Sequence, residues 1–274
     1  MCRWLAYTGS SIPLETLLFN AHHSLIDQSM SSRSAETPTN GDGFGVGWYG
    51  KRSRPGLFRS VRPAWNDFNL RELAAHVDSP LFLAHVRAAS LGAVQESNCH
   101  PFRYGNWLFM HNGEVEGIDQ FRRDLVLAIA PHLFNCIQGT TDSEIMFYLT
   151  LTFGLESDPL RALARMAGFV ENAARRCGIA QSLWMTLGVS DGKRIYVVRY
   201  ASDGDAPTLF HSRDSEDLHR LDPGLRGRIS LETRVIVSEP LGETVDDWVQ
   251  IPENTALIVH KGEAQYRPFH PVSP

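Results

Sequence analysis

Residues 2–8 of the chain read CRWLAYT, an apolar and aromatic stretch that begins at the second position. Residues 3–8 have the composition of a short β-strand. Chain termini usually fray unless a sheet holds them, so a strand this close to the start predicts that the N-terminus is fixed in the core.

Cys2 could become the N-terminal residue, because cysteine is small enough to permit removal of the initiator Met1. The new terminus would carry a thiol and an α-amine on one residue. An α-amine has an ordinary pKa of ~7.7–8.0, so a useful fraction is free base at neutral pH. That amine can accept the thiol proton, as in N-terminal nucleophile enzymes, provided that Met1 is gone. Taken alone, a cysteine at this position is more often incidental.

Apolar patterns and turn signals predict further strands and helices along the chain. Strands are expected at residues 44–49, 81–87, 107–111, 183–190, 194–200, 234–238 and 256–260. Helices are expected at residues 14–19, 69–77, 118–130 and 160–177, with a surface loop over 27–42. Strands, then helices, then strands are typical of a layered α+β fold. Because no repeat or linker interrupts the chain, residues 2–274 are expected to form one domain.

The composition, 43% hydrophobic and 21% charged over 274 residues, is ordinary for a globular protein. A formal net charge of -5 gives no reason to expect nucleic acid or an anionic membrane as a partner. The four cysteines form no CxxC pair, which disfavours a zinc ribbon or a disulfide framework. We find no secretory signal, and no apolar run approaches the ~18 residues of a membrane helix. A cytoplasmic, reduced protein is therefore expected.

The glycine-rich stretch NGDGFGVGWY at residues 40–49 contains a G-x-G-x-G pattern, as some phosphate-binding loops do. A dinucleotide fingerprint must open a helix after a strand. Here the aromatic and branched residues continue as a strand, so the glycines are expected to permit close backbone packing. The sequence thus predicts no nucleotide or other cofactor.

Two pieces of an acyl-transfer site follow predicted strands. Asn112 and Gly113 come after the strand at 107–111, where an amide and a backbone N–H could bind a developing oxyanion, although an Asn-Gly pair is usually just a turn. Arg87 ends a strand that would otherwise be buried, where an unpaired guanidinium is costly. It therefore needs a carboxylate, either structural or from a substrate.

Residues 141–144 read TDSE, which predicts a capping box with Thr141 as N-cap and Glu144 as its partner. Asp142 is then in the first helical turn, where it is equally suited to cap the helix or to bind an ammonium group. Together with Arg87 and Cys2, it supplies what a free glutamyl group demands: a cation, an anion and a nucleophile.

An ordered set of motifs resembles the class II glutamine amidotransferases. The motifs are MCR at 1–3, NGDG at 40–43, HVR at 85–87, NCHPF at 98–102, HNG at 111–113, TDSE at 141–144 and SEPL at 238–241. They stand in the family's order, which makes the set far more specific than any one of them. The resemblance implies a four-layer αββα sandwich, the N-terminal nucleophile hydrolase fold.

The resemblance also implies roles for the matching residues. Cys2 would be the nucleophile and its α-amine the base, while Asn112 and Gly113 would form the oxyanion hole. Arg87 would bind the α-carboxylate of the substrate, and Asp142 its α-ammonium group. Ser90 falls where relatives often carry a threonine near the substrate. The matching histidines are expected to be structural (His85, His100 and His111).

Amidotransferases that make products carry a synthase domain after the glutaminase domain, and this sequence shows none. It is more similar to a stand-alone branch that includes the fungal glutathione-degrading Dug proteins and the γ-glutamyl hydrolase of the ergothioneine pathway. The implied reaction is hydrolysis of a γ-glutamyl amide bond, in glutamine or in a peptide such as glutathione, through a thioester on Cys2.

Two alternatives remain at this stage. The chain could be a glutaminase subunit that passes ammonia to a partner synthase or peptidase. It could instead be a metal-dependent hydrolase that uses His85, His100 and His111 with carboxylates such as Asp42, but the spacing matches no HExxH-type motif. We therefore expect no metal.

Overall fold

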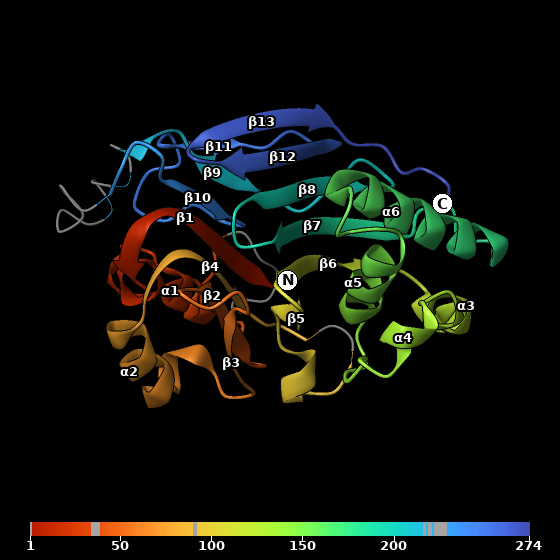
Figure 1. Ribbon diagram of the computed structural model, residues 1–274, viewed down its shortest axis with the longest axis horizontal. Coiled ribbons are helices and arrows are strands. Elements are labelled where there is room, and N and C mark those ends of the chain that lie inside the picture. The colour runs from red at the N-terminus through yellow and green to blue at the C-terminus, as the bar shows by residue number, and fades with distance from the viewer. Residues whose placement is uncertain (1, 34–38, 90–91, 216–217, 219–220, 222–228) are drawn as a thin grey trace.

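The computed structural model describes residues 2–33, 39–89, 92–215, 218, 221 and 229–274. Within these residues the strands form two antiparallel sheets packed face to face, with helices on both outer faces (Figure 1). The first sheet has the spatial order β11 (Trp248–Gln250), β9 (Phe210–Ser212), β10 (Arg234–Val237), β1 (Arg3–Pro13), β4 (Asp78–Val86), β2 (Phe44–Tyr49) and β3 (Gly56–Ser60). The second has the order β13 (Glu263–Pro268), β12 (Thr255–His260), β8 (Ile195–Ala201), β7 (Leu183–Ser190), β6 (Trp107–Val115) and β5 (Phe102–Tyr104).

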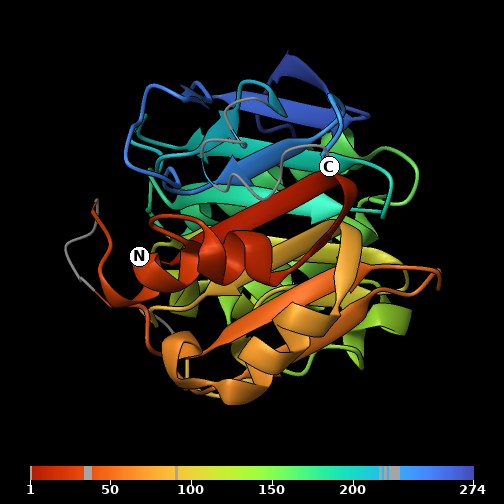
Figure 2. The same cartoon turned by 90° about the vertical axis from the view of Figure 1, so that its left-hand side faces the viewer.

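The helices form the two outer layers. Outside the first sheet are the π-helical turn η1 (Thr16–Asn20), α1 (Leu25–Met30) and α2 (Phe68–His76), seen in front of the strands in Figure 2. Outside the second sheet are α3 (Arg122–Leu127), α4 (Pro131–Phe134), α5 (Asp142–Thr152) and α6 (Pro159–Arg176). Short 3₁₀ turns are η2 (Ala64–Asn66), η3 (Glu96–Asn98) and η4 (Ile118–Gln120). This is the predicted four-layer αββα arrangement.

The first half of strand β1 is buried on both faces, which explains the unbroken apolar sequence of residues 4–7. Trp4 and Ala6 belong to the core between the sheets, where they meet Leu108 and Met110 of β6. Leu5 and Tyr7 face the other way, into the core beneath the outer helices. Alternation of side chains along a strand therefore gives β1 two apolar faces. The prediction that the start of the chain is fixed in the core is confirmed.

The helical layer over the second sheet follows the predicted patterns. Leu163, Ala167, Val170 and Ala174 on α6 are all buried, and Cys177 lies just beyond the helix, exposed. Helix α5 is buried along almost its whole length, because it lies between α6 and the sheet. No helix in the described part of the chain is long and apolar enough to cross a membrane.

The prediction of a turn at Asn112–Gly113 is wrong. Both residues lie inside β6, paired with Thr186 and Met185 of β7. Gly113 has φ +147°, which is not the left-handed helical value that an Asn-Gly hairpin turn requires. A Cβ at this position would come within 1.9 Å of the carbonyl oxygen of Trp184. The glycine is needed for close approach between strands, and the chain does not turn there.

Three other predicted segments differ in detail. The expected helix at 118–130 is divided into η4 and α3, because Phe121 at their junction has the non-helical dihedral angles φ -131° and ψ 6°. The expected loop at 27–42 begins inside α1, whose capping box at Ser24 and Asp27 was overlooked. The expected helix at 14–19 is a π-helical turn from Thr16 to Asn20.

Candidate active site

Cys2 lies where β1 begins, beside the end of β4. The antiparallel register pairs Arg3 with Val86, so its continuation by one residue sets Cys2 opposite Arg87. The half-buried Cys2 Sγ is 3.4 Å from both the backbone nitrogen and the carbonyl oxygen of Ala88. The thiol therefore sits against the first residues of the segment that follows β4.

The surroundings of Cys2 keep its thiol protonated at rest. Burial raises the pKa of the thiol, while the Ala88 N–H and the positive charge of Arg87 lower it. The negative charge of Asp142 raises it further. The net shift is upward, so a nucleophilic thiolate forms only if a nearby base accepts the proton.

Arg87 is buried at the end of β4 and is held by backbone contacts on both sides. Its N–H donates to Gly43 at 2.8 Å, and its carbonyl accepts from the N–H of Asp42 at 3.0 Å. Its guanidinium donates to the carbonyl of Ala93 at 3.2 Å. The Asp42 carboxylate in turn accepts the N–H of Ala89 at 2.8 Å. The predicted glycine-rich turn thus fixes the loop that carries Arg87, and Ser90 lies outside the described residues.

Asn112 reaches the same region from the second sheet. Leu108 and Met110 of β6 pack between the sheets, so Asn112 points to that side as well. Trp4 Nε1 donates to Thr186 Oγ1 at 3.1 Å, and Thr186 Oγ1 donates to the Asn112 carbonyl at 3.4 Å. Asn112 Oδ1 is buried with no hydrogen-bond partner within the described residues. A buried amide oxygen without a partner is uncommon in folded proteins, and a functional role is one of its explanations.

Asp142 lies at the N-terminus of α5, next to the end of β6. Its Oδ2 accepts the N–H of Val115 at 3.0 Å, and its Oδ1 accepts the N–H of Ser143 at 2.7 Å. Thr141 is the N-cap, as predicted, and accepts the N–H of Glu144. The second hydrogen bond of the predicted capping box, from the Thr141 N–H to the Glu144 side chain, does not form.

The Glu144 carboxylate instead accepts the N–H groups of Gln138 and Gly139, at 3.0 and 2.6 Å. It therefore closes the loop before α5 onto the helix. Asn98 links this loop to the other side of the site, since its side chain donates to Ala93 at 2.8 Å and accepts the N–H of Thr140 at 2.8 Å. The segments that carry Arg87 and Asp142 are thus tied together.

The three predicted structural histidines form a buried group behind the site. The ring centroids of His85 and His100 are 4.3 Å apart. Burial lowers the pKa of His85 to about 3 and that of His100 well below its ordinary value, so both are neutral near pH 7. His111 Nε2 donates to the Trp184 carbonyl at 3.3 Å, which leaves Nδ1 to accept the Ser143 hydroxyl at 2.8 Å. No group of three His, Cys, Asp or Glu among the described residues is arranged to hold a metal ion.

Sequence reasoning missed one buried carboxylate, Glu239. It accepts Arg3 Nε at 2.9 Å and the N–H of Arg33 at 3.0 Å, and it pairs with His23 at 2.5 Å. Arg3 Nη1 also donates to the Cys2 carbonyl at 3.0 Å. Glu239 therefore fixes the start of β1 and, through Arg3, the preceding Cys2, from a distant part of the sequence. Its motif was noticed, but nothing in the sequence indicated which residue it contacts.

Replacement of Glu239 by glutamine is expected to destabilise the protein. Burial alone raises the pKa of this carboxyl, but hydrogen bonds from His23, Arg33 and Arg3 lower it from 4.5 to about 2. Ionised Glu239 therefore contributes about 3 kcal/mol to the free energy of unfolding at neutral pH. Because the folded pKa is the lower one, this contribution is complete above pH 4.5 and is lost as the pH falls towards 2.

Urea unfolding of Glu239→Gln and wild type across this pH range tests the prediction. The difference in unfolding free energy should narrow as the pH falls. The exposed Glu243 supplies the control, since Glu243→Gln should stay within about 0.5 kcal/mol of wild type. A Glu239→Gln variant as stable as this control would contradict the assignment.

The chain is similar along nearly its whole length to known proteins. A family model for class-II glutamine amidotransferases matches residues 17–271. The probable glutamine amidotransferase DUG3 of Saccharomyces cerevisiae is 33% identical, over 95% of this chain and 82% of that protein. The γ-glutamyl-hercynylcysteine sulfoxide hydrolase of Mycolicibacterium smegmatis is 28% identical, over 98% of this chain and 100% of that protein.

A solved structure shares the fold. The glutamine aminotransferase class-II domain protein from Silicibacter pomeroyi has a TM-score of 0.77 and 35% sequence identity, covering 99% of this chain and 100% of that one. The predicted fold, the predicted branch and the prediction of an enzyme are confirmed by these similarities. The chain belongs to the class II glutamine amidotransferases.

Proposed function

We propose that this enzyme hydrolyses a γ-glutamyl amide bond through a thioester on Cys2. The observation that carries the proposal is the position of the Cys2 thiol opposite Arg87 and within the electrostatic reach of Asp142. A buried cation and a buried anion that both act on the thiol match the carboxylate and ammonium groups on the α-carbon of a free glutamyl group. The raised pKa of the thiol adds the need for a base, which a free α-amine on Cys2 meets.

The proposed reaction has two stages. The α-amine takes the Cys2 proton, and the thiolate attacks the side-chain amide carbon of the substrate. Asn112 and the Gly113 N–H stabilise the oxyanion, after which the amide nitrogen leaves with a proton as ammonia or an amine. Water then attacks the thioester carbon, and glutamate and the thiol are released. Arg87 binds the α-carboxylate and Asp142 the α-ammonium group throughout.

The substrate class rests on the family and on the names of two relatives. One is a probable glutamine amidotransferase, and the other is a hydrolase of a γ-glutamyl compound. A γ-glutamyl group is the part that these substrates share. We therefore propose glutamine or a γ-glutamyl peptide as substrate, with no metal or cofactor in the reaction and with residues 2–274 acting as one domain.

An electrophilic glutamine analogue, such as a γ-diazoketone, should label this enzyme on a single residue. We expect one equivalent of adduct, on the peptide that begins with Cys2, because only this thiol lies beside both charges. Peptide mass spectrometry after labelling locates the adduct. Intact mass of the unlabelled protein from its native host should show that Met1 is absent. An adduct on Cys99, Cys136 or Cys177 instead would overturn the proposal.

Product assays on the unlabelled enzyme, with the labelled enzyme as the inactive control, separate hydrolysis from ammonia transfer. A stand-alone hydrolase releases glutamate and ammonia or amine in equal amounts without another chain. A subunit that serves a partner synthase or peptidase would release glutamate slowly until the partner is added. We favour the stand-alone reaction, since the M. smegmatis relative that is named a hydrolase is aligned over 100% of its length.

A further inference from the structure

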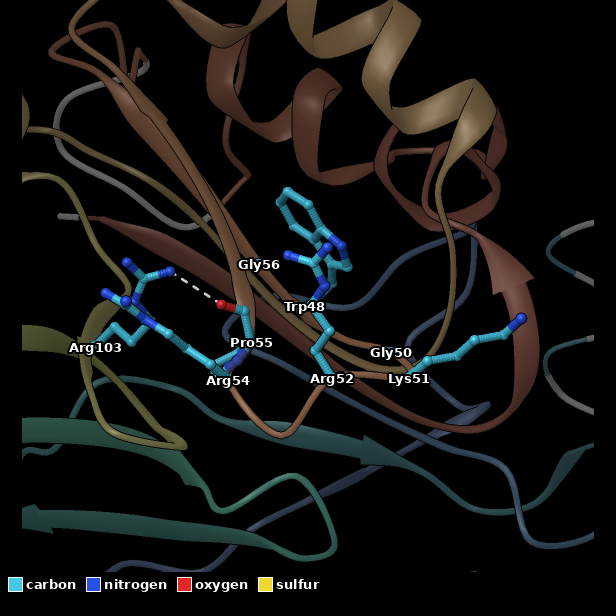
Figure 3. A pocket seen from close by; sticks show the side chains of 8 residues that line it. All are labelled: Trp48, Gly50, Lys51, Arg52, Arg54, Pro55, Gly56 and Arg103. Atoms are coloured by element: carbon cyan, nitrogen blue, oxygen red, sulfur yellow. Dashed lines mark hydrogen bonds between the residues drawn. The ribbon is translucent and has the colours of Figure 1, made fainter.

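A basic groove lies at the turn between β2 and β3, away from Cys2. Its cavity has a volume of about 580 Å³, and Lys51, Arg52, Arg54 and Arg103 line it together with Trp48 (Figure 3). A neighbouring cavity of about 530 Å³ shares Arg54 and Arg103 but is also lined by Arg59 and by Glu144, and Arg59 pairs with Gly45 near the other end of β2. We call the first cavity and its four cations the basic groove.

The groove is at the opposite end of β2 from the candidate active site. Phe44, at the start of β2, pairs with Val86 beside Arg87, whereas Trp48 pairs with Gly56 next to the groove. At about 3.4 Å per residue, the length of β2 separates the groove from Arg87 by roughly 15 Å. A ligand in the groove would therefore be distinct from a glutamyl group bound at Cys2.

The cations of the groove have no salt-bridge partner in the part of the chain that the structure describes. None of the four forms an ion pair with a carboxylate there (Lys51, Arg52, Arg54 and Arg103). This is notable in a chain whose formal net charge is -5. Burial lowers the pKa of Arg103, and the charges of Arg54 and Arg59 lower it further. Such mutual repulsion would be relieved by an incoming anion.

Two guanidinium groups, one in the groove and one in the neighbouring cavity, are held in place by backbone carbonyls. Arg103 Nη1 donates to Pro55 at 3.0 Å, the bond drawn in Figure 3. Arg59 Nη1 donates to Cys99 at 3.3 Å. Each guanidinium has five N–H donors in a planar fork, so a single anchoring bond leaves the others available. Preorganised forks of this kind suit the paired oxygens of a phosphate group.

We propose that the basic groove binds a small molecule that carries two or more phosphate groups. The number of cations exceeds what one carboxylate or monophosphate would neutralise. The cavity volume is in the range of small-molecule sites. Trp48 borders the cavity and offers an apolar surface to the organic part of the ligand.

Isothermal titration calorimetry of the full-length protein with tripolyphosphate, and separately with ADP, tests this proposal. We expect saturable binding of one equivalent that weakens as salt is added. The variant R54Q/R103Q should bind about tenfold more weakly or worse, as expected when charge-assisted hydrogen bonds are lost. R54Q alone should show part of the loss, and it leaves the Arg103–Pro55 bond intact.

The matched control removes the same charge elsewhere. R175Q/R176Q alters two exposed arginines on α6 and should bind both probes as the wild type does. Equal weakening in this control would show that only net charge matters and would overturn the proposal. The absence of saturable binding to wild type would do the same. Tighter binding of citrate or of an acidic peptide than of tripolyphosphate would also reject a phosphate ligand.

Discussion

Purified Cys2→Ala is expected to release glutamate from glutamine or a γ-glutamyl peptide at least about a thousandfold more slowly than wild type. Loss of a nucleophile that forms a covalent intermediate typically removes most of the rate enhancement of an enzyme. The proposed substrate binding by Arg87 and Asp142 should persist, because the Ala93 carbonyl holds the guanidinium and the Val115 N–H holds the carboxylate in the variant as well. The expected signature is therefore a collapse of kcat while the substrate still binds.

Two further variants make this result specific. Cys177 is exposed beyond α6, so Cys177→Ala should keep the wild-type rate. Cys2→Ser keeps the α-amine and offers a hydroxyl, which is a weaker nucleophile, and should retain only a small part of the activity. Thermal unfolding should change little in Cys2→Ala, since the half-buried residue precedes β1. Glutamate release by Cys2→Ala at the wild-type rate would refute thioester chemistry at Cys2.

Local signals in the sequence were sufficient for much of the fold. The apolar run of β1, the helical spacing of α6 and the cap at Thr141 each depend on neighbouring residues, and each was predicted correctly. The short strands β9 and β11 were not predicted. Each has only three residues, which is too short for a recognisable alternation of apolar and polar residues. Pairing with neighbouring strands defines both of them.

Long-range contacts account for the features that sequence reasoning missed. Glu239 binds Arg3 across 236 positions, and no local pattern indicates such a pair. The Asn112–Gly113 pair has the local sequence of a turn, yet it pairs with Thr186 and Met185 on the distant strand β7. The candidate site is therefore predictable as a set of residue types, whereas its assembly depends on the pairing of strands.

Replacement of Asn112 by leucine is expected to separate activity from stability. If Asn112 stabilises the oxyanion, its loss should lower kcat by about 10²–10³. Its Oδ1 is buried without a partner among the described residues, so the native protein already bears the cost of an unsatisfied polar atom. Leucine removes that cost, and the free energy of unfolding should stay the same or rise by about 1 kcal/mol.

Asn98 provides the matched control, because it is the same residue type with similar burial but complete hydrogen bonding. Asn98→Leu leaves the Thr140 N–H and the Ala93 carbonyl unpaired, and should destabilise the protein by about 2–3 kcal/mol. Urea unfolding and steady-state kinetics on both variants compare the two effects. Wild-type kcat in Asn112→Leu would exclude the oxyanion role. Destabilisation equal to that of Asn98→Leu would mean that Asn112 has structural partners of its own. The predicted combination, lower kcat without lower stability, distinguishes a group that stabilises a transition state from one that holds the fold.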